Sequence, residues 1–221
     1  MGITEEALTV KFTACSKVSQ PQIFIRRCDS TEWLKSMKID KGITIYYGSP
    51  EKEKGELIKR VEEGCYVAVA YTDENVIVGF IVVEEFRVPI GRTVLAYSYV
   101  YDAAIDVSKN WRGKGIAGKL VDFASKDSFF DDKIVLARGT VENWDISKPE
   151  EKEPYRRMLL HLAKKAGFKI VDKNPFGDDF LAVRIGSKVS RTTVENLDKI
   201  IKELGEAYFR VKTSIILDFF K

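Results

Sequence analysis

The chain has few of the residues that build metal centres and disulfide frameworks. Its 221 residues include one histidine and three cysteines, and Cys15, Cys28 and Cys65 show no metal-like pairing. We therefore expect no metal site, and we expect the thiols to pack as small apolar groups in a reducing cytoplasm. Glutamine is also scarce, while Lys, Glu and Ile abound, which is compatible with a thermophile without being diagnostic of one.

Long apolar runs and a strong excess of charge are missing as well. No apolar stretch approaches the ~18 residues of a membrane span, and the N-terminus MGITEEALTV lacks the basic region of a signal peptide. The net charge is only +3, so neither nucleic acid nor a membrane is expected as a partner. Hydrophobic residues at 45% and charged residues at 31% describe a soluble globular protein, and the length of 221 residues suits one domain with an appendage.

Residues 105–123, IDVSKNWRGKGIAGKLVDF, read as a strand, a polar turn and a helix. Three glycines lie in this stretch, Gly113, Gly115 and Gly118, and Arg112, Lys114 and Lys119 add positive charge around them. Glycine lets the backbone take positive φ and approach a ligand closely. The free N–H groups and the dipole of a helix start favour an anion. A phosphorylated ligand is therefore the first inference.

Two motifs overlap on these residues. The glycines spell G-x-G-x-x-G, a dinucleotide fingerprint that requires a buried strand opening a βαβ unit. Arg112, Gly115 and Ala117 also spell R-x-x-G-x-A. The order of the surrounding elements has to decide between the two motifs.

Periodicity and turn residues predict that order. Strands are expected at 23–27, 65–71, 76–86, 93–107, 133–137, 168–171 and 180–185, and helices at 30–37, 50–63, 115–125 and 154–166. A capping box at Asp29 and Glu32 begins the first helix, and Ser49-Pro50 begins the second. A further strand at 8–14 is of uncertain place. The glycine loop thus follows the third strand of an antiparallel meander, which counts against a dinucleotide fold.

The segment beyond Gly186 extends this arrangement. A capping box from Thr192 to Glu195 predicts a helix to about Leu204, followed by the tail RVKTSIILDFFK. That tail is too apolar for a solvated terminus, so it packs either on the domain or on a second subunit of a homodimer. We divide the chain into an N-terminal extension (1–21), a main domain (22–187) and a C-terminal helix and tail (188–221).

Motif and element order together resemble the GCN5-related N-acetyltransferase (GNAT) family. The resemblance covers about residues 23–185, and R-x-x-G-x-A and the helix ending in Ala166-Gly167-Phe168 are its most specific pieces. It implies a mixed α/β (α+β) fold, in which helices flank a central, mostly antiparallel sheet, here with a C-terminal helical extension. It also implies transfer of an acetyl group from acetyl-coenzyme A (acetyl-CoA) to an amine by direct attack in a ternary complex.

The resemblance further implies which residues bind the coenzyme. The pyrophosphate would be bound by backbone N–H groups of Arg112, Gly113, Lys114, Gly115, Ile116 and Ala117, with Lys114 and Lys119 as side-chain partners. The strand end, Ile105, Asp106 and Val107, would bind the pantetheine and polarise the thioester carbonyl. Asn143 stands near the position of a coenzyme-contacting asparagine in the family, with a simple loop residue as the alternative.

The general base and the general acid of the transfer reaction have several candidates. The strand before the motif offers Asp102 and Asp106 as the general base, and Asp102 is our candidate, with a structural carboxylate as the alternative. The family's usual acid, a Tyr four residues before Gly-Phe, is replaced by Ala163. Tyr155 is eight residues earlier, roughly 12 Å along a helix, and the sole histidine, His161, falls on the polar helix face.

The acceptor amine stays open. It would meet residues 37–50, where Tyr46 and Tyr47 lie, and the later strands with Tyr99 and Tyr101, although aromatic residues at such positions are more often core. Three hypotheses remain: an acetyl-CoA-dependent N-acetyltransferase, an acyl-CoA-binding module without turnover, and a nucleotide-binding enzyme that uses the literal G-x-G-x-x-G.

Overall fold

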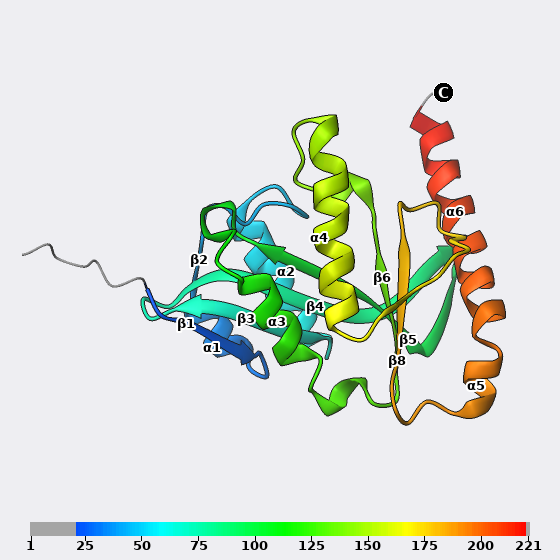
Figure 1. The fold of residues 1–221 in the computed structure, drawn as a ribbon, viewed down its shortest axis with the longest axis horizontal. Helices are drawn as coiled ribbons and strands as arrows, with labels where there is room; N and C mark the ends of the chain where they lie inside the picture. Colours follow the sequence, from blue (N-terminus) through cyan, green and yellow to red (C-terminus); the bar gives the residue numbers. More distant parts are fainter. Residues whose placement is uncertain (1–20, 220–221) are drawn as a thin grey trace, which may run out of the picture.

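A mixed sheet organises the molecule in the computed structural model, which describes residues 21–219, with side chains up to residue 212. The eight strands are β1 (Ile23–Arg27), β2 (Lys38–Ile39), β3 (Tyr66–Thr72), β4 (Val76–Ile90), β5 (Thr93–Val107), β6 (Ile134–Arg138), β7 (Lys169–Ile170) and β8 (Leu181–Ile185). Their order is β1-β3-β4-β5-β6-β8-β7, with β2 beside the start of β4 (Figure 1). Only the pairs β5–β6 and β2–β4 are parallel. The predicted mixed, mostly antiparallel sheet is confirmed.

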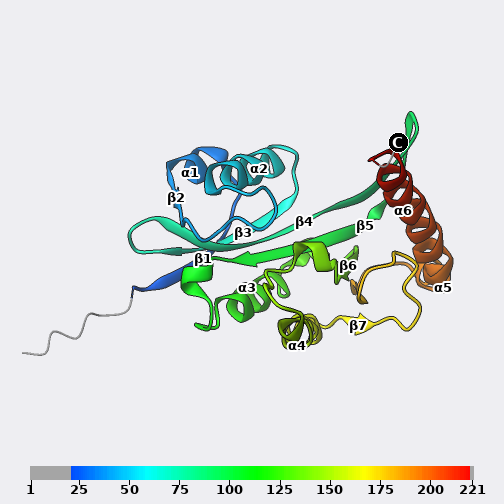
Figure 2. The ribbon, with the colours of Figure 1, turned by 90° about the horizontal axis from the view of Figure 1, so that it is seen from above.

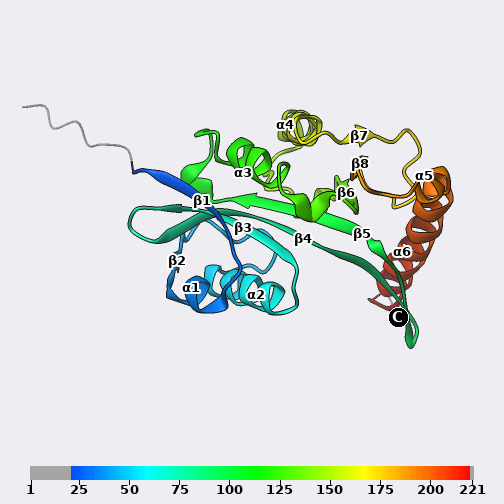
Figure 3. The ribbon, with the colours of Figure 1, turned by 90° about the horizontal axis from the view of Figure 1, so that it is seen from below.

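Helices cover both faces of this sheet. They are α1 (Thr31–Ser36), α2 (Pro50–Glu62), α3 (Ile116–Ala124), α4 (Lys152–Lys165), α5 (Arg191–Glu195) and α6 (Leu197–Phe219). In Figure 2, α1 and α2 lie on one face and α3 and α4 on the other. Figure 3 shows the same layers from the opposite side, with α6 at the far end of the long β4–β5 hairpin.

The helix starts follow from capping residues. Ser49 accepts a hydrogen bond from Lys52 N, and Pro50 takes the first helical position of α2, as predicted. The start of α1 differs in detail, because Ser30 rather than Asp29 is the N-cap. Its hydroxyl oxygen accepts from Trp33 N, and Glu32 accepts from the Ser30 hydroxyl at 3.0 Å.

Strand β4 is the centre of the sheet, as its two apolar faces predict. It pairs with β3 on one side and β5 on the other. One face packs with Leu34 and Leu57 of α1 and α2, and the other packs with Leu120 of α3. Near Phe86 the register shifts, because this one residue lies opposite the four residues 97–100 of β5. Beyond the shift, β4 and β5 pair again and form the end of a long β-hairpin.

The C-terminal helix corrects two predictions. The N-cap of α5 is Ser190, whose hydroxyl oxygen accepts from Thr193 N, rather than Thr192. Helix α6 does not end at Leu204 but continues through Gly205. A Cβ at Gly205 would lie 2.6 Å from Pro175 Cβ, so glycine serves close packing there and not chain reversal.

Helix α6 packs on the domain along its described side chains. Leu204 is fully buried, and it lies in one cluster with Phe86 of β4 and with Phe176. Val211, in the described part of the tail, also packs against this cluster, while a contact with a second subunit stays a prediction. The strand expected at 8–14 lies outside the described residues. No helix within residues 21–219 is long and apolar enough to cross a membrane.

Candidate active site

Strands β5 and β6 separate after a short parallel contact. Only Val100–Asp102 of β5 pair with Ile134–Leu136 of β6, while β5 continues to Val107 and β6 continues along β8 to Arg138. A cavity of about 310 Å³ occupies the resulting gap and reaches both faces of the sheet. Its walls include Tyr46, Tyr47, Leu57 and Arg60 on the α2 side and Trp144, Tyr155, Leu162 and Ala163 on the α4 side. We call it the splay cavity.

The glycine loop, residues 112–117, leads from the end of β5 into α3. Gly113 has φ +76° and Gly115 has φ +74°, a region that disfavours side chains. Gly115 is the N-cap of α3 and provides no side-chain acceptor for the first N–H groups. Apart from the adjoining residues of the loop, no atom of the described residues lies within 4 Å of a Cβ built at either glycine. The loop therefore presents open space and free donors, as an anion site requires.

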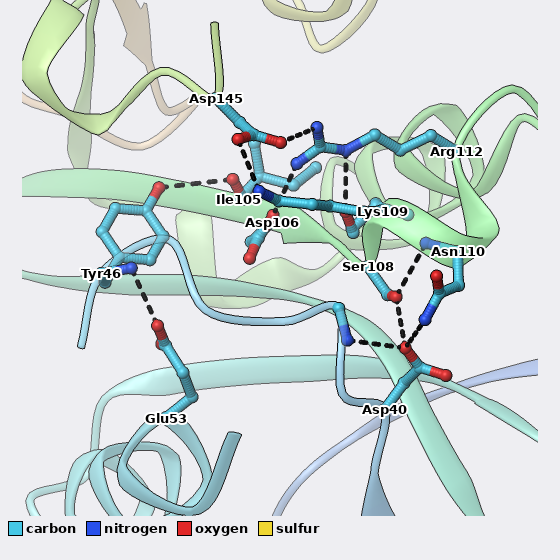
Figure 4. A network of polar contacts seen from close by, with 12 residues as sticks. Asp40, Tyr46, Glu53, Ile105, Asp106, Ser108, Lys109, Asn110, Arg112 and Asp145 are labelled. Carbon is cyan, nitrogen blue, oxygen red and sulfur yellow. Dashed lines mark hydrogen bonds and ion pairs between the residues drawn. The ribbon is translucent and has the colours of Figure 1, made fainter. Parts of the chain in front are cut away.

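The basic residues of this loop divide into two groups. Arg112 turns back toward the strand end, where its Nε donates to Val107 O at 3.1 Å and its guanidinium pairs with Asp145 (Figure 4). The Nζ of Lys114 lies 4.2 Å from the centroid of the Trp111 ring. Lys119 is exposed. Arg112 is thus engaged by the strand end and by Asp145, whereas Lys114 lies over an aromatic ring and Lys119, in the first turn of α3, faces solvent.

The end of β5 carries two polar groups, and of the two residues only Ile105 lines the splay cavity. Ile105 O accepts a hydrogen bond from the Tyr46 hydroxyl at 3.3 Å. Asp106 is only 6% exposed, and its Oδ2 has no hydrogen-bond partner among the described residues. Burial raises the pKa of this carboxyl to about 6, although Arg112 opposes the shift. Asp106 is therefore a carboxyl that holds its proton more tightly than an ordinary aspartate.

Asp102 lines the splay cavity as one half of an ion pair. Its Oδ2 lies 2.7 Å from Nη2 of Arg138, which also pairs with Asp178 at 3.1 Å. The Arg138 guanidinium further lies 4.7 Å from the centroid of the Tyr208 ring of α6. This candidate base is thus held in place by an arginine that the sequence did not single out.

The last core helix contributes no acid at the expected position. Ala163 and Tyr155 both line the splay cavity, and Tyr155 stacks on Trp144 with ring centroids 5.5 Å apart. Burial raises the pKa of Tyr155. His161 is exposed, as its place on the polar face predicted. Asn143, at the end of a short 3-10 helix (Val141–Asn143), also lines the cavity.

The four tyrosines considered for the acceptor side separate in the structure. Tyr46 and Tyr47 line the splay cavity. Tyr101 packs on the α3 side against Phe129, with ring centroids 5.8 Å apart, and Tyr99 packs with the α6 cluster. The last two are therefore core aromatics.

Two carboxylates that the sequence analysis missed organise the loop before α2. Glu53, 1% exposed, accepts from Tyr46 N at 2.8 Å and from Tyr47 N at 2.7 Å. Asp40 accepts hydrogen bonds from four donors: Gly42 N, the Ser108 hydroxyl, Asn110 Nδ2 and Trp111 Nε1. Asp40 and Gly42 form the D-x-G pattern of an Asx turn, a signal for the turn but not for the remote partners. Within the described residues, no cluster of three His, Cys, Asp or Glu could hold a metal ion.

Comparisons with known proteins agree with this architecture. The model of the Acetyltransferase (GNAT) family matches residues 31–143, just over half of the chain, so the chain belongs to this family. The solved structure of an acetoin utilization protein from Exiguobacterium sibiricum is 19% identical, with a TM-score of 0.64. That match covers 83% of this chain and 96% of the other, and at this identity it shows the fold.

Two further solved structures are more distant. A phosphinothricin acetyltransferase from Sinorhizobium meliloti, in complex with AcCoA, is 17% identical over 76% of this chain and 94% of its own, with a TM-score of 0.45. A ribosomal-protein-alanine N-acetyltransferase from Brucella melitensis is 17% identical over 73% and 99%, with a TM-score of 0.45. A search of curated proteins finds no match.

Proposed function

We propose that this protein transfers an acetyl group from acetyl-CoA to an amine acceptor by direct attack in a ternary complex. One observation carries the proposal: the glycine loop opens at the end of β5, where β5 and β6 have separated around the splay cavity. N–H donors that could bind a diphosphate thus lie beside a gap in the sheet. An extended ligand with amide groups could fill this gap, because its amides can hydrogen-bond to the strand backbone. Membership of the family supports the same reading.

The coenzyme residues follow from this placement. N–H groups from Arg112 to Ala117 would bind the pyrophosphate, with the exposed Lys114 and Lys119 as side-chain partners. The pantetheine would lie beside the end of β5 and contact the backbone of Ile105, Asp106 and Val107. Asn143 lines the cavity from the opposite wall. Most of these contacts are main-chain, so they depend on backbone geometry more than on side-chain identity.

The reaction needs few groups. The amine nitrogen forms a bond to the thioester carbon while the C–S bond breaks, one proton leaves the amine, and the thiolate takes up a proton. Backbone N–H groups at the end of β5 would stabilise the oxyanion. Asp102 is the proposed base, reaching the amine directly or through a water molecule. Its ion pair with Arg138 fixes the carboxylate in the cavity wall.

The proton for the thiolate has no assigned donor. Ala163 provides none, and Tyr46 and Tyr155 are phenols in the walls of the same cavity. Of the two, Tyr46 lies at the strand end, with its hydroxyl on Ile105 O. We therefore place Tyr46 as the candidate donor.

Ala163 also favours a second candidate function. A protein of this fold that binds acyl-CoA without turnover would need the glycine loop and the splay cavity but no general acid. In such a protein, the ion pair of Asp102 with Arg138 would only stabilise the fold. Turnover separates the two functions. Release of free thiol from acetyl-CoA, followed across primary amines and peptides and confirmed by the mass of acetylated product, would establish the enzyme. Tight binding with no product from any acceptor would establish the binding module.

The coenzyme site itself is tested by Gly115→Glu. The new carboxylate would occupy the open space of the anion site, and the positive φ would cost about 1–2 kcal/mol. Gly64→Glu is the matched control, because Gly64 has φ +77° and equally open surroundings at the end of α2. In calorimetry we expect CoA binding to be lost in Gly115→Glu and kept in Gly64→Glu. Unchanged affinity in folded Gly115→Glu, or dinucleotide binding in place of CoA, would overturn the assignment.

A further inference from the structure

The turn before the glycine loop is attached to a second, distant loop. This turn, residues 108–111, joins β5 to the glycine loop and includes Ser108, which is fully buried. The second loop, residues 40–48, runs from the end of β2 to the start of α2 and carries Tyr46; we call it the acceptor-side loop. The two segments are about seventy positions apart in sequence, and Asp40 joins them (Figure 4).

One carboxylate makes the connection. Asp40 Oδ1 accepts from the Ser108 hydroxyl at 2.5 Å, from Asn110 Nδ2 at 2.9 Å and from Gly42 N at 2.9 Å. Its Oδ2 accepts from Trp111 Nε1 at 3.2 Å. Three of the four donors thus belong to the turn before the glycine loop, and the fourth belongs to the acceptor-side loop.

Backbone contacts tighten the same junction. Lys109 N donates to Gly42 O at 3.3 Å. A Cβ at Gly42 would collide with the Ser108 hydroxyl and lie 2.9 Å from Lys109 N. The two loops therefore touch at backbone distance, and a movement of one has to displace the other.

The far end of the acceptor-side loop is held independently. Glu53 accepts from Tyr46 N and Tyr47 N, and the Tyr46 hydroxyl donates to Ile105 O on β5. With Asp40 at its start and Glu53 at its end, the loop is attached on both sides. Removal of Asp40 would weaken the attachment to residues 108–111, which would then depend on the Lys109 N–Gly42 O bond, and would leave the attachment at Glu53 in place.

We propose that Asp40 is a positioning residue that couples residues 108–117 to the acceptor-side loop, so that the two segments move together. Coenzyme binding at the glycine loop would then also order the wall of the splay cavity that the acceptor-side loop forms. Because coupling between two sites is reciprocal, an acceptor would in turn tighten the coenzyme. This inference rests on the proposed function for its ligand. It assigns Asp40 no contact with the reacting atoms.

The test uses amide hydrogen exchange on the full chain, with CoA as the probe at saturating concentration. In the wild type we expect CoA to slow exchange both in peptides covering 108–118 and in peptides covering 40–48. In Asp40→Ala, protection of 108–118 should remain while protection of 40–48 is lost. Asp40→Asn should be intermediate, because its amide can still accept from the donors around Oδ1. Asp172→Asn, a change at an exposed aspartate, should behave as wild type.

The outcomes separate the two proposals. Equal CoA protection of 40–48 in Asp40→Ala and wild type would overturn the coupling, since direct contact with CoA would then explain it. Protection of 108–118 alone in the wild type would overturn it as well. Absence of any protection in the wild type would instead overturn the coenzyme assignment, and the coupling with it. Should Asp40→Ala fail to fold, Ser108→Ala removes one of the same hydrogen bonds and should weaken protection of 40–48 by itself.

A kinetic measurement extends the test once an acceptor is found. Loss of coupling should change KM for the acceptor, or the effect of acceptor on CoA affinity, by on the order of 5- to 150-fold. A purely structural role would lower the amount of folded protein without that selective change. Unaltered coupling in folded Asp40→Ala would therefore contradict the proposal.

Discussion

The hydroxyl of Tyr46 and the carbonyl oxygen of Ile105 lie 3.3 Å apart, although 59 positions separate the residues in the chain. Tyr46 belongs to the loop between β2 and α2, and Ile105 belongs to β5 beyond its last pair with β6. The contact therefore brings a side chain from the α2 side of the sheet to the strand edge that borders the splay cavity. It makes Tyr46 the first side chain to test.

Tyr46→Phe removes this hydroxyl and little else. If Tyr46 protonates the departing thiolate, turnover should fall by about 10²-fold or more, while the free energy of unfolding falls by only about 1 kcal/mol. Steady-state rates together with calorimetry of CoA binding would measure both effects. Tyr47→Phe is the control, because the Tyr47 oxygen accepts from Arg60 at 2.8 Å instead of meeting the strand. Equal turnover in both variants would reduce Tyr46 to a packing residue.

Asp102→Asn should lower turnover at neutral pH far more than it alters acetyl-CoA affinity, because the coenzyme contacts are mainly backbone. The effect of a broken ion pair has to be separated from the loss of a base. Asp178→Asn serves this purpose, since Asp178 is the other partner of Arg138 and does not line the splay cavity. We expect it to cost stability without a comparable loss of kcat. Parallel losses in the two variants would assign Asp102 a structural role.

Asp106 should make stability depend on pH in an unusual direction. Burial raises the pKa of its carboxyl to about 6 in the folded chain, from an ordinary value near 4 when unfolded. The folded state then binds more protons between these values, so this group's contribution declines as the pH rises from about 4 to about 6. The decline should amount to no more than about 3 kcal/mol.

Urea unfolding at a series of pH values would measure this dependence. Asp106→Asn cannot ionise, so the difference in unfolding free energy between wild type and variant isolates the one group. We expect the variant to gain stability relative to wild type as the pH rises through this window. A constant difference between pH 4 and pH 7 would contradict the raised pKa.

Leu204→Ala tests whether α6 is part of the folding unit. Leu204 is fully buried in the cluster with Phe86 and Phe176, so the truncation should cost about 2–5 kcal/mol. Lys199→Ala on the exposed side of the same helix should change stability by less than about 0.5 kcal/mol. A single unfolding transition that shifts for all probes would show that α6 unfolds with the sheet. A separate early transition would instead make α6 an independent appendage.

The sequence predicted best those helices and strands whose ends carry a capping residue, a proline or a glycine. Strand β5 was expected at 93–107 and is found at Thr93–Val107, because a tight turn at Gly91 precedes it and the polar glycine stretch follows it. Strand β4 runs on to Ile90 instead of ending near residue 86, so Pro89 lies in the hairpin and not in its turn. Helix α2 was predicted from Ser49, Pro50 and Gly64, three residues whose backbone preferences act within one turn. The glycine loop was recognised because its geometry requires glycine in the sequence itself.

The remote partners could not be predicted in the same way. Arg138 lies 36 positions from Asp102, and Asp40 lies 68 positions from Ser108. No periodicity relates such pairs, which arise only when the strands are placed side by side. The predicted helix end at Leu204 was wrong for a related reason. A glycine after a helical pattern usually marks the end of the helix, whereas Gly205 lies inside α6, where a side chain would collide with Pro175.

The separation of β5 from β6 creates an edge strand in the interior of the sheet. An outer edge of this kind is a template for aggregation, because any extended chain in solution can pair with it. Here β6 and β8 stand on the far side of the gap, and the helices α2 and α4 border its two openings. A second folded protein is too bulky to enter, whereas one thin, flexible ligand with amide groups is not. The geometry that would leave backbone groups of β5 accessible to the proposed coenzyme would thus also protect the protein from self-association through them.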